Sequence, residues 1–134
     1  ATGAGLWDWN IATGDLVVNE RWAGILGYTL DELSPLGVAT WMELIHEKDR
    51  QRMDQVLVEH FTGMRDVFDM ELRMWHSQGR YIWVYGRGML VERSEKGEPL
   101  RMTGTLTDIS ARKRAEQQLL RSNEILDRCL RIAR

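Results

Sequence analysis

Three histidines and one cysteine are the residues of this chain best suited to metal ligation or nucleophilic attack: His46, His60, His76 and Cys129. They lie far apart in the sequence, and no closely spaced pair of them matches the ligand spacing of a zinc site. The sequence also has no glycine-rich phosphate loop and no credible Ser-His-Asp or Cys-His arrangement. We therefore predict that this segment is not an enzyme and holds no metal.

The elements that would position any site are predicted from hydrophobic periodicity. Aromatic and β-branched residues, or apolar residues that alternate with polar ones, mark several strands. Turn-forming residues separate these segments at 12–15, 76–79 and 94–99. The predicted strands are residues 6–11, 16–18, 68–74, 80–92 and 100–109.

Short helices are predicted between the second and third strands. Apolar residues at helical spacing indicate a helix around 22–26, which Gly27 ends. Two capping boxes predict two further helix starts: Thr29 with Glu32, and Thr40 with Glu43. The longest helix of the body is predicted at 47–61, and a terminal helix begins near Ser110. This order predicts an α+β domain whose antiparallel sheet is covered by helices on one face.

Composition and charge exclude several classes of protein. Of the 134 residues, 43% are hydrophobic and 28% are charged, which is typical of a chain with a packed core. The longest apolar run is far shorter than a membrane helix, and one cysteine allows no internal disulfide, so we expect a soluble, cytoplasmic domain without direct membrane contact. Residues 1–109 carry 11 basic and 17 acidic side chains, whereas residues 110–134 carry 7 and 3. Acidic residues interrupt this basic tail, so we do not expect nucleic-acid binding.

A series of short motifs runs along most of the chain. They are Gly5-Leu6-Trp7-Asp8-Trp9, the segment 22–28, His46-Glu47-Lys48-Asp49-Arg50, Glu71-Leu72-Arg73, Gly79, Trp83, Gly104, Thr107-Asp108-Ile109-Ser110, Lys113 and Glu116. Each motif is weak alone, but the ordered set resembles the PAS sensor domains with the PAC motif, found in bacterial signalling proteins. The chain departs from the family at Glu47, where Pro is frequent, and at Ser110, where Thr is frequent.

The resemblance implies a five-stranded antiparallel sheet, order 2-1-5-4-3, whose helices on one face enclose a central cavity. It divides the chain into a PAS/PAC sensor domain at 1–109 and a C-terminal signalling helix at 110–134. Such domains detect a small ligand or partner and relay the signal to a covalently linked output domain, such as a two-component histidine kinase or a diguanylate cyclase. The alternative is a ligand-free scaffold for dimerisation and relay. Because the chain lacks an initiating Met, we expect a piece of a longer protein.

The predicted inner faces supply candidate ligand-binding residues: Met53, Val56, His60, Met70, Leu72, Met74, Val84, Gly86, Met102 and Leu106. Flexible thioethers suit a small, mostly apolar ligand. The alternative, which we favour, is an ordinary Met-rich core that large side chains fill completely.

Glycine and tryptophan positions bear on whether this cavity is open. Gly86, Gly88 and Gly104 fall on inward faces, where a glycine either leaves space or marks a close approach of a helix. The six tryptophans come from different elements, so we expect them to divide between the core and the sheet surface. A cage of converging indoles is not expected.

Two cofactors of the family fit the sequence poorly. Haem-binding relatives attach iron through a histidine of the long helix, and His60 lies on the apolar stripe of that helix. Its place at the helix end favours instead a structural histidine that bonds free backbone groups. Flavin photoreceptors need a cysteine in the helical region, whereas Cys129 lies in the tail. The positions where amides would contact a noncovalent flavin are apolar here: Met74, Val84 and Leu106.

The tail carries the predicted output of the domain. Asp108 and Ser110 are the expected signal-relay residues, with Ser110 as the helix cap. The spacing 4, 3, 4, 3 predicts the seam of a parallel coiled-coil homodimer, with a polar residue at one a position. The seam residues are Leu119, Asn123, Leu126, Leu130 and Ala133. Since the seam spans about two heptads, the alternative is an amphipathic helix that folds onto its own body.

Overall fold

The computed structural model describes residues 3–133, so residues 1, 2 and 134 of the predicted ranges lie outside it. It contains one antiparallel sheet of order β2-β1-β5-β4-β3, which confirms the expected topology. The strands are β1 (Gly5–Asn10), β2 (Leu16–Val18), β3 (Phe68–His76), β4 (Arg80–Arg93) and β5 (Pro99–Asp108). β3 continues two residues beyond its predicted end, because Trp75 pairs with Tyr81 and His76 with Arg80.

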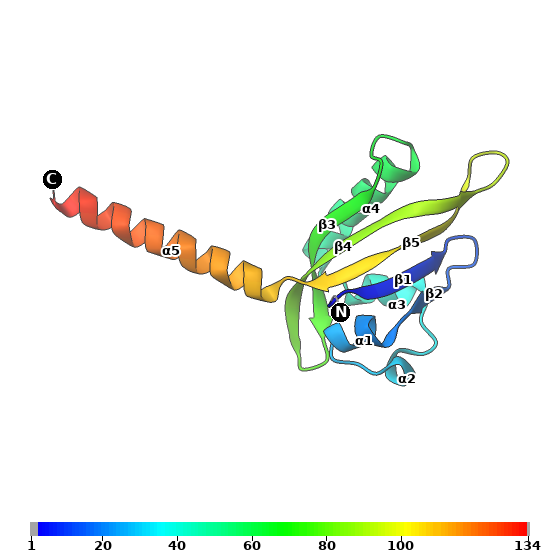
Figure 1. Cartoon of the computed structure of the whole chain (residues 1–134), viewed down its shortest axis with the longest axis horizontal. Helices are drawn as coiled ribbons and strands as arrows, with labels where there is room; N and C mark the ends of the chain where they lie inside the picture. The colour runs from blue at the N-terminus through cyan, green and yellow to red at the C-terminus, as the bar shows by residue number, and fades with distance from the viewer. Residues whose placement is uncertain (1–2, 134) are drawn as a thin grey trace.

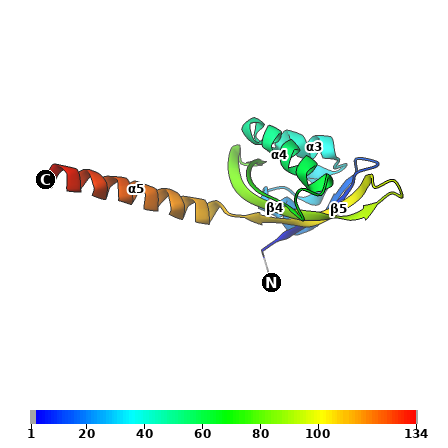
Figure 2. The same ribbon diagram turned by 90° about the horizontal axis from the view of Figure 1, so that it is seen from above.

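Four helices connect β2 to β3 and lie over one face of the sheet (Figure 2). They are α1 (Glu20–Ile25), α2 (Leu30–Leu33), α3 (Val38–Leu44) and α4 (Glu47–Phe61). The last helix, α5 (Ser110–Ala133), continues from β5 and extends away from the body (Figure 1). The predicted α+β architecture is therefore confirmed.

One predicted helix start is confirmed and the other is wrong. The Thr29 hydroxyl accepts from Glu32 N, and the Glu32 carboxylate accepts from Thr29 N, so α2 has its capping box. Thr40, by contrast, lies inside α3, which starts after Gly37 without a side-chain cap. Gly37 pairs with Asp15 beside the first hairpin, and Val38 N donates to Gly14 O at 2.8 Å. This tertiary contact starts the helix before the local capping signal is reached.

The core fills the space between the helices and the inner face of the sheet. Alternate residues of β3 and β4 are buried, as the pattern of apolar residues predicts. The largest fully buried side chains are Trp22, Phe68, Leu26, Ile45, Met53, Leu72, Met74, Met102 and Val84.

The glycines of the inner face have different surroundings. Trp7 lies across the sheet, and a Cβ built on Gly88 would come within 2.5 Å of its ring and 2.6 Å of the Thr103 carbonyl oxygen. Gly104 meets the same indole. Close approach is therefore the correct alternative at Gly88 and Gly104, although the approaching group is Trp7 and not a helix. Gly86 is different, because a Cβ there would meet nothing nearer than 3.7 Å.

This contrast gives a matched pair of substitutions. We expect Gly88→Ala to lower the free energy of unfolding by about 1–3 kcal/mol, because the new methyl group overlaps Trp7 and a backbone carbonyl. Gly86→Ala adds the same methyl group to the same strand in ordinary van der Waals contact and is expected to change stability little. Urea unfolding measures both. Equal losses in the two variants would show that Trp7 does not constrain Gly88.

Candidate functional site

A small cavity lies between the sheet and the helices. It has a volume of about 20 Å³, enough for about one water molecule. Its walls are aromatic, aliphatic and thioether side chains, with a single glycine. The lining residues are Trp7, Trp9, Leu16, Trp22, Trp41, Met53, Phe68, Leu72, Met74, Gly86 and Leu106.

Half of the predicted ligand-binding residues line this cavity. They are Met53, Leu72, Met74, Gly86 and Leu106. Val56, Met70, Val84 and Met102 are buried in the same core but do not contribute to the wall. Sites for drug-sized ligands have volumes of ~300–1,000 Å³. In this conformation the side chains fill the core, as the Met-rich alternative expects, and a larger ligand requires them to move.

His60 has a structural role outside the cavity wall. Its Nδ1 lies 3.0 Å from the carbonyl oxygen of Arg65, and Leu90 N donates to its Nε2 at 3.0 Å. Because a carbonyl only accepts, Nδ1 carries the proton and the ring is neutral. The imidazole thus joins the end of α4 to the following loop and to β4. Both ring nitrogens are occupied, so the structure supports the structural reading of His60 and not iron ligation.

The tryptophans divide between the core and the sheet surface as expected, but those in the core also converge. Trp7, Trp9, Trp22 and Trp41 converge on the cavity from β1, α1 and α3. The spacing within β1 is one reason, because Trp7 and Trp9 are two residues apart and so share the inner face. Trp83 is on the opposite face of the sheet, beneath charged side chains. The expectation of no convergence is therefore wrong for four of the six.

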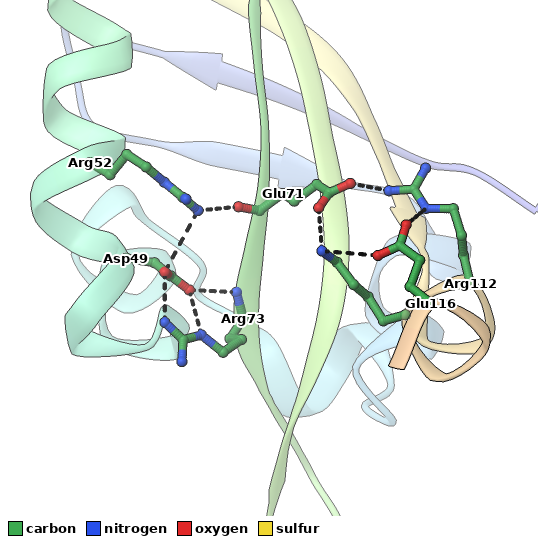
Figure 3. A network of polar contacts seen from close by, with 7 residues as sticks. Asp49, Arg52, Glu71, Arg73, Arg112 and Glu116 are labelled. Atoms are coloured by element: carbon green, nitrogen blue, oxygen red, sulfur yellow. Dashed lines mark hydrogen bonds and ion pairs between the residues drawn. The ribbon is translucent and has the colours of Figure 1, made fainter. Parts of the chain in front are cut away.

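A buried carboxylate joins α4 to β3. Asp49, only 4% exposed, accepts from Arg73 N at 2.8 Å, from Arg73 Nε at 3.0 Å and from Arg73 Nη2 at 2.9 Å (Figure 3). Burial alone would raise the pKa of the Asp49 carboxyl, but the hydrogen bonds from Arg73 outweigh it and lower the pKa. Asp49 and Arg73 belong to two of the motifs shared with the PAS family, yet the sequence did not reveal that they form a pair.

A second carboxylate, Glu71, connects this pair to α5 (Figure 3). The Glu71 side chain accepts from Lys113 Nζ at 2.6 Å and from Arg112 Nη2. Arg52 completes the connection, because its Nη2 lies 3.6 Å from Asp49 Oδ1 and donates to the Glu71 carbonyl oxygen. These contacts form one polar network from α4 through β3 to the first turns of α5.

The Trp83 ring packs against the same junction between the sheet and α5. Lys113 Nζ lies 4.6 Å from the centre of its ring and the Arg73 guanidinium carbon 5.1 Å, both within the range of cation–π attraction. The junction itself is capped by Asp108, whose Oδ1 accepts from Ser110 N at 2.8 Å. The prediction that the Ser110 hydroxyl caps the helix is wrong, since that hydroxyl donates to the Trp83 carbonyl oxygen at 3.4 Å.

Comparison with known proteins agrees with this architecture. A family model described as PAS fold matches residues 15–106, well over half of the chain. The chain belongs to the PAS fold family. It is 33% identical over 103 residues to the methyl sulfide methyltransferase-associated sensor of Methanosarcina acetivorans, covering 77% of this chain and 10% of that protein. Over 80 residues it is 35% identical to hybrid signal transduction histidine kinase A of Dictyostelium discoideum, covering 58% of this chain and 4% of that protein.

Solved structures show the same likeness. A sensory box histidine kinase/response regulator from Burkholderia thailandensis superimposes with a TM-score of 0.80 at 36% identity, covering 94% of this chain and 92% of that chain. The N-terminal domain of a diguanylate cyclase with a PAS/PAC sensor from Marinobacter aquaeolei gives 0.69 at 23% identity, covering 82% and 98%, and shows the shared fold. The chain is thus a PAS sensor domain of the kind found in signalling proteins.

Two further properties concern the part of the PAS domain that the structure describes. Residues 3–133 contain no cluster of three His, Cys, Asp or Glu side chains arranged to hold a metal ion. Within the same residues, no helix combines the length and the apolar character needed to cross a membrane.

The Glu71–Lys113 pair predicts how pH acts on the start of α5. The hydrogen bond from Lys113 holds the pKa of Glu71 below its usual 4.5, and the same bond raises the pKa of Lys113 above 10.5. The attachment is therefore complete at neutral pH, is lost as the pH falls through the lowered pKa of Glu71, and is lost again above the raised pKa of Lys113. We expect the Trp83 indole resonance to shift in an acid step below pH 4.5. The control is Glu71→Gln, which should lack this step, and identical acid titrations of the two proteins would contradict the assignment.

Proposed function

We propose that this PAS domain detects a small ligand or partner at its cavity and relays the change through α5 to an output domain, such as a histidine kinase or a diguanylate cyclase. The observation that carries the proposal is the polar network from Asp49 through Glu71 to Lys113. It begins on α4 and β3, two of the elements that line the cavity, and ends on the helix that leaves the body. The named kinase and sensor among the relatives support an output of this kind.

α4 and β3 each carry part of the cavity wall and part of the polar network, so a shift of either element would change both. α4 carries Met53 into the cavity wall, and one turn earlier it carries Asp49 into the network. β3 turns Leu72 toward the cavity and the intervening Glu71 and Arg73 toward the outer face, because neighbouring strand residues point to opposite sides. With room for about one water molecule, any larger occupant displaces these elements.

The second candidate function is a ligand-free dimer that sets the geometry of its neighbours. It is supported by the exposed apolar seam of α5, since Leu119, Leu126 and Leu130 are 56–62% exposed. In the structure α5 extends from the body instead of folding back over the sheet, which leaves this stripe without a partner in the described chain (Figure 1). We propose that the seam pairs two copies as a parallel coiled coil, with Asn123 facing its counterpart. Such a dimer is compatible with sensing.

Asp108 gives a test of the relay. When residues 1–134 replace the PAS domain of a histidine kinase, we expect the cavity substitution Met53→Ala to change autophosphorylation about fivefold or more. In the Asp108→Ala background the same substitution should have no effect, because α5 has lost the cap that fixes its angle to β5.

Asp108→Asn is the matched control, since it keeps an oxygen acceptor for Ser110 N and should keep the response. Urea unfolding of the isolated domain verifies that the body folds in each variant. An equal effect of Met53→Ala with and without Asp108 would contradict a relay through this junction.

The seam gives a separate prediction. We expect light scattering to show a concentration-dependent dimer, and Asn123→Leu to form larger or more stable assemblies, because a buried Asn restricts pairing to two strands. Arg121→Leu is the control, as it adds the same side chain on the side of the helix opposite the seam. If the wild type and Asn123→Leu are both monomeric at every concentration, the coiled-coil assignment is wrong.

A further inference from the structure

The indole of Trp9 carries a hydrogen-bond donor without a partner. Trp9 lines the cavity and is 8% exposed, and its Nε1 is the one buried side-chain nitrogen or oxygen among residues 3–133 that lacks an acceptor. Its neighbour in the wall differs, because Trp7 Nε1 donates to the Thr105 carbonyl oxygen at 3.0 Å. An unpaired buried donor costs ~1–3 kcal/mol, so its retention on a residue that lines the cavity points to an acceptor that arrives from outside the chain as the wall adapts.

The chemistry of the wall restricts what that acceptor can be. Apart from weakly accepting thioethers, the lining side chains offer only indole N–H donors, and the remaining surface is hydrocarbon. A ligand with its own donor groups would leave them unpaired, and a charged ligand would lose its hydration without a counter-charge. Water is also a poor match, because a buried water forms about three hydrogen bonds. The complementary ligand is neutral, with an oxygen acceptor and no donor.

The size of the site sets a second restriction. The cavity of about 20 Å³ admits a ligand of a few non-hydrogen atoms only if the wall adapts. Met53 and Met74 are unbranched and repack readily, and Gly86 leaves its part of the wall flat. Trp7, locked over Gly88, gives the opposite wall a fixed shape.

We propose that the cavity binds a small neutral ketone, aldehyde or ether, and that Trp9 Nε1 donates a hydrogen bond to its oxygen. This inference rests on the proposed sensing function, because it names the class of ligand for that cavity. Trp9 acts as the residue that distinguishes an oxygen acceptor from a hydrocarbon of the same shape.

Cyclopentanone and methylenecyclopentane test this directly, since they differ in the replacement of C=O by C=CH₂. The indole N–H resonances of ¹⁵N-labelled protein are followed by NMR as each compound is added, and dissociation constants are taken from the titrations. We expect the ketone to move the Trp9 N–H proton downfield and to bind about three- to tenfold more tightly than the hydrocarbon, the increment of one hydrogen bond.

Trp9→Phe should bind the two compounds equally. Trp75 is an exposed residue in edge-to-face contact with Tyr81 outside the cavity, so Trp75→Phe should keep the preference for the ketone. The wild-type titrations remain decisive if Trp9→Phe does not fold. Equal affinities, an unmoved Trp9 N–H resonance, or no binding of either compound would overturn the inference. These NMR measurements do not depend on kinase output. A failure of the proposed relay in the Asp108 test can therefore be distinguished from a failure of ligand binding in the cavity.

Discussion

The buried carboxylate of Asp49 is the constraint on which the rest of the structure depends. A charge removed from water must be compensated within the protein, and Arg73 supplies both a guanidinium and a backbone N–H. The pair holds the first turn of α4 at a fixed position against β3. That position places Met53 over the sheet as the cavity wall and Arg52 within reach of the Glu71 carbonyl. Breaking the pair would leave an uncompensated buried charge and release both arrangements together.

Side chains of β3 point alternately to the two faces of the sheet, and these faces have different chemistry. Inward residues form an apolar wall, while outward Glu71 binds Lys113 and Arg112 at the basic start of α5. The basic character of the tail then has a physical use at this point, because the Glu71 carboxylate attracts the positively charged side chains at the start of α5. Surface pairs of this type contribute little to stability, typically ~0.2–1 kcal/mol. A weak attachment suits the proposed relay, in which this junction changes with the state of the cavity.

The sequence predicted what local periodicity and turn chemistry determine. The strand order followed from the resemblance, and the buried residues of β3 followed from strict alternation. The failures share a cause, since each involves contacts between residues distant in the chain. Thr40 did not start α3 because Gly14 and Asp15 bind the preceding residues. Three further contacts depend on strand register, which one sequence does not specify. They are the convergence of the tryptophans, the pairing of Glu71 with Lys113, and the packing of the Trp7 ring over Gly88.

The two sides of the cavity differ in how readily they yield. On the β1 and β5 side, Trp7 lies wedged over Gly88 and Gly104 and donates to Thr105, so that displacement meets backbone atoms. On the α4 and β3 side, Met53 and Met74 present flexible thioethers, and Gly86 of the neighbouring strand β4 adds no side chain. An occupant larger than the cavity therefore pushes toward α4 and β3, the elements that carry Asp49 and Glu71. Because the network to α5 starts on this yielding side, the packing of the core supports the proposed relay, in which displacement in the cavity is directed toward the helix that leaves the domain.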